Sequence, residues 1–103
     1  MDTVLKETFR IDNAKIYYET AGQGDAIVLV HAGFLDNRMW DAQFAFFSRF
    51  YRVVRFDMRG YGRSDAVDQP VVRRDEVYHL MKHLGIEKAV MVGCSLGGEM
   101  VLD

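Results

Sequence analysis

The sequence of 103 residues has a single cysteine, a single proline and no excess of positive charge. One cysteine cannot form a disulfide within the chain, so a disulfide framework is excluded. The formal net charge of −2 offers no basic surface, which argues against nucleic acid as a partner. The longest apolar run, Ala26 to Val30, is far too short to span a bilayer. The first residues lack the basic and apolar parts of a signal peptide, so we expect a cytoplasmic protein that does not enter a membrane.

Half of the residues are hydrophobic and 27% are charged, which is typical of a globular domain. A chain of this length is expected to hold one domain, so residues 1–103 are treated as a single unit. Two β-prone runs, 8–11 and 15–20, flank Asp12 and Asn13 and predict a hairpin. Three further strands are predicted at Ala26–Val30, Arg52–Phe56 and Lys88–Val92.

Helical periodicity separates the last three predicted strands. Apolar side chains recur on one helical face in two segments, 40–47 and 77–84, and a third helix is expected to begin at Ser95 or Leu96. Strands that alternate with helices predict the α/β class, here a β-hairpin followed by parallel strands with right-handed crossover helices. In such a sheet the functional residues gather at the carboxyl ends of the strands.

Each of these three strands is followed by a segment that contains glycine. The segments are His31-Ala32-Gly33-Phe34, Asp57-x-Arg59-Gly60-x-Gly62-x-Ser64 and Gly93-Cys94-Ser95-Leu96-Gly97-Gly98. The pattern Gly93-x-Ser95-x-Gly97 between a strand and a helix is typical of a nucleophile elbow, whose tight turn lifts the serine hydroxyl above the sheet. Small residues are needed on either side because larger side chains would collide with the turn. The turn also aims the first amides of the helix at an anion that forms beside the serine.

Other residues near these positions have simpler interpretations. His31 is expected to hold loop backbone through its ring nitrogens rather than to act as a base. Its neighbour Gly33 permits close backbone approach, so an amide there is a candidate oxyanion donor. Cys94 is expected to be a small buried hydrophobic residue. Glu99 stands where a phosphate-binding loop requires lysine, so no nucleotide cofactor is predicted, and no metal site is predicted either.

Several charged residues are expected to be structural. The pairs Asp57–Arg59 and Arg63–Asp65 are expected to pin a loop rather than to perform chemistry. Glu76 is expected on the solvated face of the second predicted helix, opposite the apolar stripe.

Taken together, the three segments resemble the α/β-hydrolase superfamily, whose oxyanion loop, Asp-x-Arg-Gly-x-Gly-x-Ser loop and nucleophile elbow they match in order. The oxyanion segment has Ala32 where the family usually has glycine. The resemblance implies that Ser95 is the nucleophile and that the Leu96 amide is one donor of the oxyanion hole. It implies that the amide of Gly33, or that of its neighbour Phe34, is the second donor. Serine rather than aspartate at the elbow argues against epoxide hydrolases and haloalkane dehalogenases. Esterases, enol-lactonase-like enzymes, carbon–carbon bond hydrolases and perhydrolases stay open.

The resemblance also implies more chain than is present, because the family's acid and histidine follow the serine in sequence. Only eight residues follow Ser95, and none of them is a histidine. We therefore expect an incomplete α/β-hydrolase fold, the N-terminal part of a hydrolase for an ester, lactone or related small-molecule acyl substrate, inactive by itself.

The strand order that the resemblance implies, 1-2-4-3-5, leaves the strand at 88–92 on an edge of the sheet. Its unpaired backbone invites self-association or pairing with a missing C-terminal part. The alternative to a hydrolase is a noncatalytic remnant or interaction module that associates through this edge.

Overall fold

The computed structural model describes residues 4–31, 35–66 and 73–93. In chain order the elements are β1 (Leu5–Ile11), β2 (Ala14–Ala21), β3 (Ala26–Val30), the 3-10 helix η1 (Asn37–Trp40), α1 (Asp41–Phe47), β4 (Arg52–Phe56), α2 (Arg73–His83) and β5 (Ala89–Gly93). The predicted hairpin and the first two predicted helices are confirmed, and β3 and β4 have the predicted bounds. The last strand begins and ends one residue later than predicted. The helix expected from Ser95 onward lies outside the described residues.

The five strands form one sheet in the order β1-β2-β4-β3-β5. The hairpin strands β1 and β2 are antiparallel to each other, and β2 is antiparallel to β4. The other two pairs, β3 with β4 and β3 with β5, are parallel. Asp12 turns the hairpin with a φ of 54°, in the left-handed region that Asp tolerates better than most residues. The predicted α/β class, a hairpin followed by parallel strands, is therefore confirmed.

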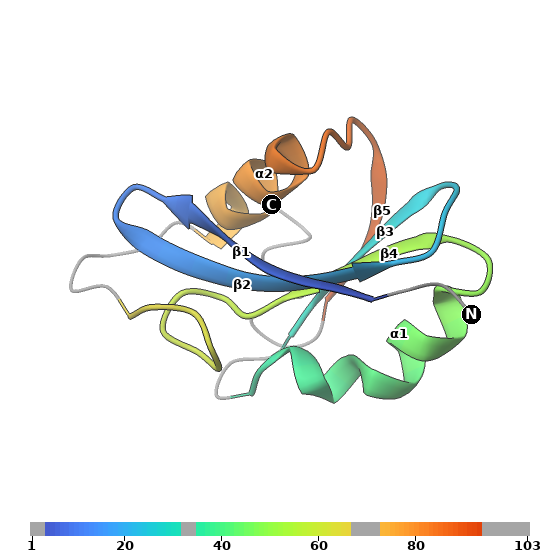
Figure 1. Cartoon of the computed structure of the whole chain (residues 1–103), viewed down its shortest axis with the longest axis horizontal. Helices are drawn as coiled ribbons and strands as arrows, with labels where there is room; N and C mark the ends of the chain where they lie inside the picture. Colours follow the sequence, from blue (N-terminus) through green and yellow to red (C-terminus); the bar gives the residue numbers. More distant parts are fainter. Residues whose placement is uncertain (1–3, 32–34, 67–72, 94–103) are drawn as a thin grey trace.

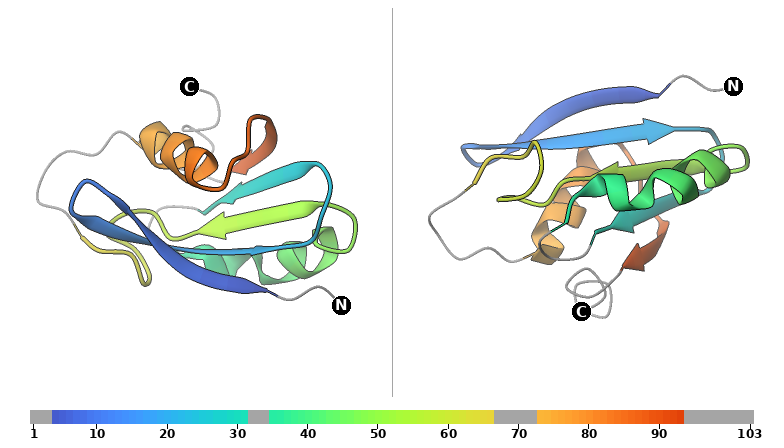
Figure 2. Two further views of the ribbon diagram at one scale, coloured as in Figure 1. Left: turned by 45° about the horizontal axis from the view of Figure 1, so that its top comes forward. Right: turned by 90° about the horizontal axis from the view of Figure 1, so that it is seen from below.

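The two α-helices cover opposite faces of the sheet, as Figures 1 and 2 show. All five residues of β3 are buried, which explains why this strand is apolar without alternation. Its side chains alternate between the two layers. The layer under α2 contains Phe9, Ile16, Tyr18, Val28, Val30, Val54, Phe56, Val77 and Leu80. The layer under α1 contains Ala21, Ile27, Leu29, Trp40, Phe44 and Val53.

The last strand, β5, lies at an edge of the described sheet, where its only strand partner is β3 (Figure 2). The Val90 side chain is 63% exposed, and no residue from Ala89 to Gly93 is charged. Natural edge strands usually carry charges or bulges that discourage pairing with another chain. This edge lacks charged side chains, and the expectation that the fifth strand lies at an edge is confirmed.

Candidate active site

The three strands that precede the motifs have their carboxyl ends next to one another in the sheet. Val30 is the last residue of β3, and it lies opposite Phe56 of β4 and Gly93 of β5. Because all three strands are parallel, their carboxyl ends lie side by side. The expected convergence of the three motifs is therefore present up to Gly93. The predicted nucleophile and the predicted oxyanion donors, Ser95, Leu96, Gly33 and Phe34, lie outside the described residues.

His31 directly follows β3, and its side chain accepts a buried hydrogen bond. Its side chain is fully buried, and its Nε2 accepts the backbone N–H of Met58 at 2.9 Å. The ring also packs edge-on against Tyr61, with 5.3 Å between the ring centroids. An Nε2 that accepts a hydrogen bond carries no proton, so in the neutral ring the proton is on Nδ1. The prediction that His31 holds loop backbone is confirmed.

Asp57 is the first residue after β4, and its buried carboxylate accepts hydrogen bonds from two segments of the chain. Oδ1 accepts the backbone N–H of Asn37 at 2.7 Å and the Nδ2 of the same residue at 2.6 Å. Oδ2 accepts the backbone N–H of Arg63 at 2.9 Å. Buried carboxylates need such donors because desolvation of the charge is costly. Asp57 thus joins the start of η1 to the loop after β4.

The rest of that loop is fastened to β2. Ser64 accepts the backbone N–H of Tyr17 at 2.9 Å and donates its hydroxyl to the carbonyl of Asp57. Asp65 accepts the backbone N–H of Lys15 at 2.9 Å. The expectation that these charged residues pin a loop is thus confirmed for Asp57 and Asp65, but their carboxylates bind backbone amides and, at Asp57, also the Asn37 side chain.

Glu76 of α2 is fully buried, so the expectation that it lies on the solvated face was wrong. Its carboxylate accepts the backbone N–H of Arg59 at 3.0 Å and the Nε of the same residue at 3.1 Å. A charged carboxylate can be buried here because one residue of the loop supplies both an amide and a guanidinium. This pair ties the start of α2 to the loop after β4.

A second charged pair, Asp36 with Arg38, lies where the connection from β3 reaches η1, and its arginine side chain is exposed. Asp36 caps η1 by accepting the backbone N–H of Arg38 at 2.9 Å. The guanidinium of Arg38 binds the same carboxylate at 2.7 Å. This hydrogen bond from Arg38 lowers the pKa of Asp36 to about 2, so the cap stays ionised at neutral pH.

A buried charged cluster lies on the α1 side of the sheet. Arg55 of β4 binds Glu19 of β2 at 2.8 Å and Asp41 of α1 at 2.5 Å, and its guanidinium lies 4.3 Å from the ring centroid of Phe44. The hydroxyl of Tyr17 donates to Glu19 at 2.5 Å. Burial alone would raise the pKa of Glu19, but the hydrogen bonds from Tyr17 and Arg55 outweigh it and lower this pKa. Burial and the bond to Glu19 raise the pKa of Tyr17.

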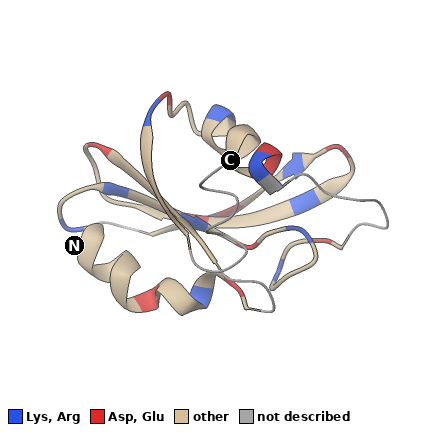
Figure 3. Ribbon diagram, turned by 180° about the vertical axis from the view of Figure 1, so that it is seen from behind, with Lys and Arg blue, Asp and Glu red and all other residues tan. Residues whose placement is uncertain are grey.

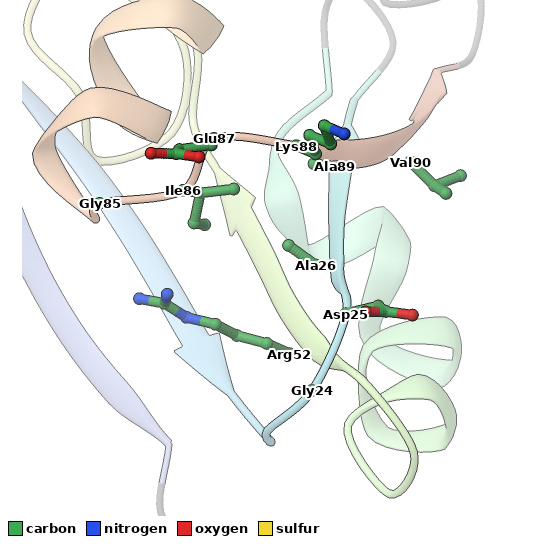
Figure 4. A pocket seen from close by; sticks show the side chains of 10 residues that line it. All are labelled: Gly24, Asp25, Ala26, Arg52, Gly85, Ile86, Glu87, Lys88, Ala89 and Val90. Carbon is green, nitrogen blue, oxygen red and sulfur yellow. The ribbon is translucent and has the colours of Figure 1, made fainter.

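Two hollows lie at opposite ends of the strands. One adjoins the candidate site and is lined by Asp36, Asn37, Arg38, Asp57, Gly62 and Arg63. The other, shown in Figure 4, lies at the amino ends of β3, β4 and β5, and its lining includes Arg52, Lys88, Asp25 and Glu87. Charges of both signs are interspersed along the ribbon (Figure 3), so neither hollow selects a ligand by net charge.

Within residues 4–31, 35–66 and 73–93, no group of three or more His, Cys, Asp or Glu side chains is placed to hold a metal ion. In the same part of the chain, no helix is long and apolar enough to cross a membrane.

Gly62 approaches the Asp57 carboxylate so closely that we expect Gly62→Ala to destabilise the protein. A Cβ at Gly62 would lie 2.4 Å from Oδ2 of Asp57, and the residue has a φ of +50°. The left-handed backbone costs about 1 kcal/mol for alanine, and displacing the carboxylate adds about 1–3 kcal/mol. The matched control is Gly85→Ala, with a φ of +69° but no atom within 4 Å of its Cβ. Urea denaturation of both variants measures the difference, and equal losses of stability would contradict the close contact.

Comparison with known proteins identifies the family. The profile described as "Alpha/beta hydrolase family" matches residues 27–103, and the chain belongs to this family. It is 34% identical over 101 residues to 2-hydroxy-6-oxo-6-phenylhexa-2,4-dienoate hydrolase of Burkholderia cepacia, a match that covers 90% of this chain and 35% of that protein. It is 39% identical over 94 residues to a bifunctional esterase/perhydrolase of Acinetobacter calcoaceticus, covering 84% of this chain and 34% of the relative. The chain thus spans about a third of the length of these relatives.

The fold agrees with that assignment. The crystal structure of the enol-lactonase from Burkholderia xenovorans LB400 matches with a TM-score of 0.86 and 31% identity, covering 91% of this chain and 39% of that chain. The described sheet is therefore the N-terminal part of an α/β-hydrolase fold, as the motifs predicted.

Proposed function

We propose that this chain supplies the nucleophile of a serine hydrolase that acts on an ester, a lactone or a related acyl bond of a small molecule. The observation that supports it best is the alignment of Val30, Phe56 and Gly93 at one end of three parallel strands. This alignment brings the start of the Gly93-x-Ser95-x-Gly97 pattern next to the segment that begins at His31. A serine at such a position is the nucleophile of an elbow. Relatives named as an enol-lactonase and as an esterase/perhydrolase favour acyl chemistry.

In the proposed reaction the Oγ of Ser95 attacks the acyl carbonyl and transfers its proton to a histidine base. The carbonyl oxygen becomes an anion that accepts hydrogen bonds from the Leu96 amide and from the amide of Gly33 or Phe34. Collapse of this intermediate expels the leaving group, which takes the proton from the histidine, and water then hydrolyses the acyl-enzyme. The histidine and its acid partner are proposed to lie beyond residue 103 or on another chain, because the chain spans only about a third of its relatives.

A fluorophosphonate probe tests this proposal, because it reacts with an activated serine and needs no known substrate. We expect labelling of a longer product that contains these residues together with the downstream acid and histidine. We expect no labelling of the 103-residue chain alone, since an unassisted hydroxyl is a weak nucleophile. Strong labelling of the short chain would contradict the proposed location of the base, and no labelling of any form would contradict the hydrolase.

A second candidate function is association through the edge of β5, favoured by the exposure of Val90 and the lack of charge along the strand. The partner would be either a second copy of the chain or the missing C-terminal part, which would pair with the free backbone of this edge. In this reading the 103-residue chain is a noncatalytic module. A cytoplasmic location stays a prediction for both functions.

The edge proposal predicts that Val90→Lys weakens self-association of the 103-residue chain by at least about tenfold in dissociation constant, because a lysine on a free edge opposes pairing. Sedimentation at several protein concentrations measures this constant. Tyr78→Lys is the matched control, since Tyr78 is similarly exposed, at 62%, but lies on the helix α2 rather than on a strand. A monomeric wild-type chain at every concentration, or equal effects of the two variants, would contradict self-association through the edge.

A further inference from the structure

The two ends of the connection between β3 and η1 are held by Asp57 and Met58, the two residues that follow β4. At its start, His31 accepts the backbone N–H of Met58 at 2.9 Å. At its end, Asn37 donates both its backbone N–H and its Nδ2 to Asp57, at 2.7 and 2.6 Å. Each of these contacts is buried. Two contacts to neighbouring residues that directly follow a central strand fix the separation of the two ends of the connection.

The arrangement of polar atoms shows that the contact at Asn37 is specific. The amide of Asn37 has one orientation here, because exchanging its oxygen and nitrogen would place the oxygen against the carboxylate of Asp57. Its Oδ1 is buried and has no donor among the described residues. Asn37 thus donates its Nδ2 to Asp57 even though its Oδ1 has no donor among the described residues. This indicates that the hydrogen bond to the carboxylate contributes more than the unpaired oxygen costs.

We propose that His31 and Asp57 are positioning residues for the oxyanion hole. The inference rests on the proposed function, in which the connection they hold supplies the donor amide of Gly33 or Phe34. Neither side chain is expected to touch the substrate, because both are buried in contacts with loop backbone. Their effect is to fix where the connection starts and ends, and small errors in donor placement weaken stabilisation of the transition state.

Amide hydrogen exchange on the 103-residue chain tests the anchors without any activity. We expect the backbone N–H groups of Asn37 and Met58 to exchange at least about a hundredfold more slowly than free peptide. We expect Asp57→Asn to speed exchange at Asn37 by at least about tenfold, since the variant loses the negative charge that strengthens both hydrogen bonds from Asn37. Fast exchange at both amides in the wild-type chain would overturn the proposal, even if the variant fails to fold.

Two matched variants make the assignment specific. Asp65→Asn makes the same change in the same loop, where the carboxylate accepts from Lys15, and it should leave exchange at Asn37 within about twofold. His31→Gln retains an acceptor at the end of a side chain of similar reach and should keep Met58 protected, whereas His31→Leu should not. Faster exchange at Asn37 in Asp65→Asn, or protection of Met58 in His31→Leu, would overturn the anchors.

Kinetics on the longer product that the probe labels tests the positioning role itself. Asp57→Asn should lower kcat by about tenfold with KM within about twofold, because oxyanion donors act mainly in the transition state. Asp65→Asn should change neither constant. An active enzyme whose kcat is unchanged by Asp57→Asn would overturn the positioning role, while absence of labelling in every form would overturn only the proposed function and leave the exchange result standing.

Discussion

Replacing Ser95 with alanine is expected to lower hydrolysis of an activated ester by at least about a thousandfold in the longer product. The reason is that the acyl-enzyme cannot form without the hydroxyl, and the oxyanion donors alone give only weak catalysis. The same substitution should abolish labelling by the fluorophosphonate probe. Initial rates with a p-nitrophenyl ester, measured at equal concentrations of folded protein, provide the test.

Cys94→Ala is the natural control for that variant, since Cys94 adjoins the serine in the same predicted turn and is the single cysteine. We expect its rate to stay within about threefold of wild type, because one small side chain replaces another. Loss of activity in Cys94→Ala with retention in Ser95→Ala would instead make the cysteine the nucleophile.

The largest expected effect on stability comes from Glu19→Gln, which should cost about 3–5 kcal/mol of unfolding free energy at pH 7. Glu19 is 5% exposed, and its carboxylate accepts from Tyr17 and binds the buried guanidinium of Arg55. Removing the negative charge leaves Arg55 with only the partly exposed Asp41 as its ionic partner in the cluster. Denaturation by urea at neutral pH measures the loss.

This difference should depend on pH with a defined sign. The folded protein lowers the pKa of Glu19, so ionised Glu19 stabilises the fold above its unfolded pKa of about 4.3. The contribution is lost as the pH falls through the lower pKa of the folded state. The gap in stability between wild type and Glu19→Gln should therefore be full at pH 7 and shrink below about pH 4. A gap that is constant from pH 7 to pH 3 would contradict the assigned cause.

Asp41→Asn provides the matched control, because Asp41 binds the same guanidinium but its side chain is 69% exposed. We expect a loss below about 1 kcal/mol, as for other solvent-exposed ion pairs. Equal effects at Glu19 and Asp41 would mean that burial does not decide the strength of this cluster.

The strands and helices could be predicted where one local pattern determined them. The bounds of β3 were predictable because a strand covered on both faces is apolar without alternation. The hairpin was located by Asp12 and Asn13, but β1 and β2 extend further than the β-prone runs. Their ends depend on pairing with each other and, for β2, with β4, which local propensity does not report.

The contacts around the candidate site were less predictable because they join residues far apart in sequence. Glu19 and Arg55 are partners only because the register of β2 and β4 places them opposite each other. Glu76 could have been recognised as partly inward-facing, since it lies one turn before Leu80 of the apolar stripe. The hydrogen bonds of Asn37 could not be predicted from the sequence, because its partner Asp57 follows β4 and lies 20 residues away along the chain. The hydrogen bonds from backbone amides to Asp57 and Asp65 could not be predicted from the sequence either.

The central claim is that an activated hydroxyl on Ser95 performs acyl chemistry, and the site of the probe adduct tests it most directly. Trypsin cleavage after Lys88 releases a peptide that begins at Ala89 and contains both Cys94 and Ser95, because residues 89–103 include no Lys or Arg. Fragmentation of this peptide from the labelled longer product should place the phosphonate on Ser95. An adduct on Cys94, on a residue outside this peptide, or on no residue at all would contradict the account.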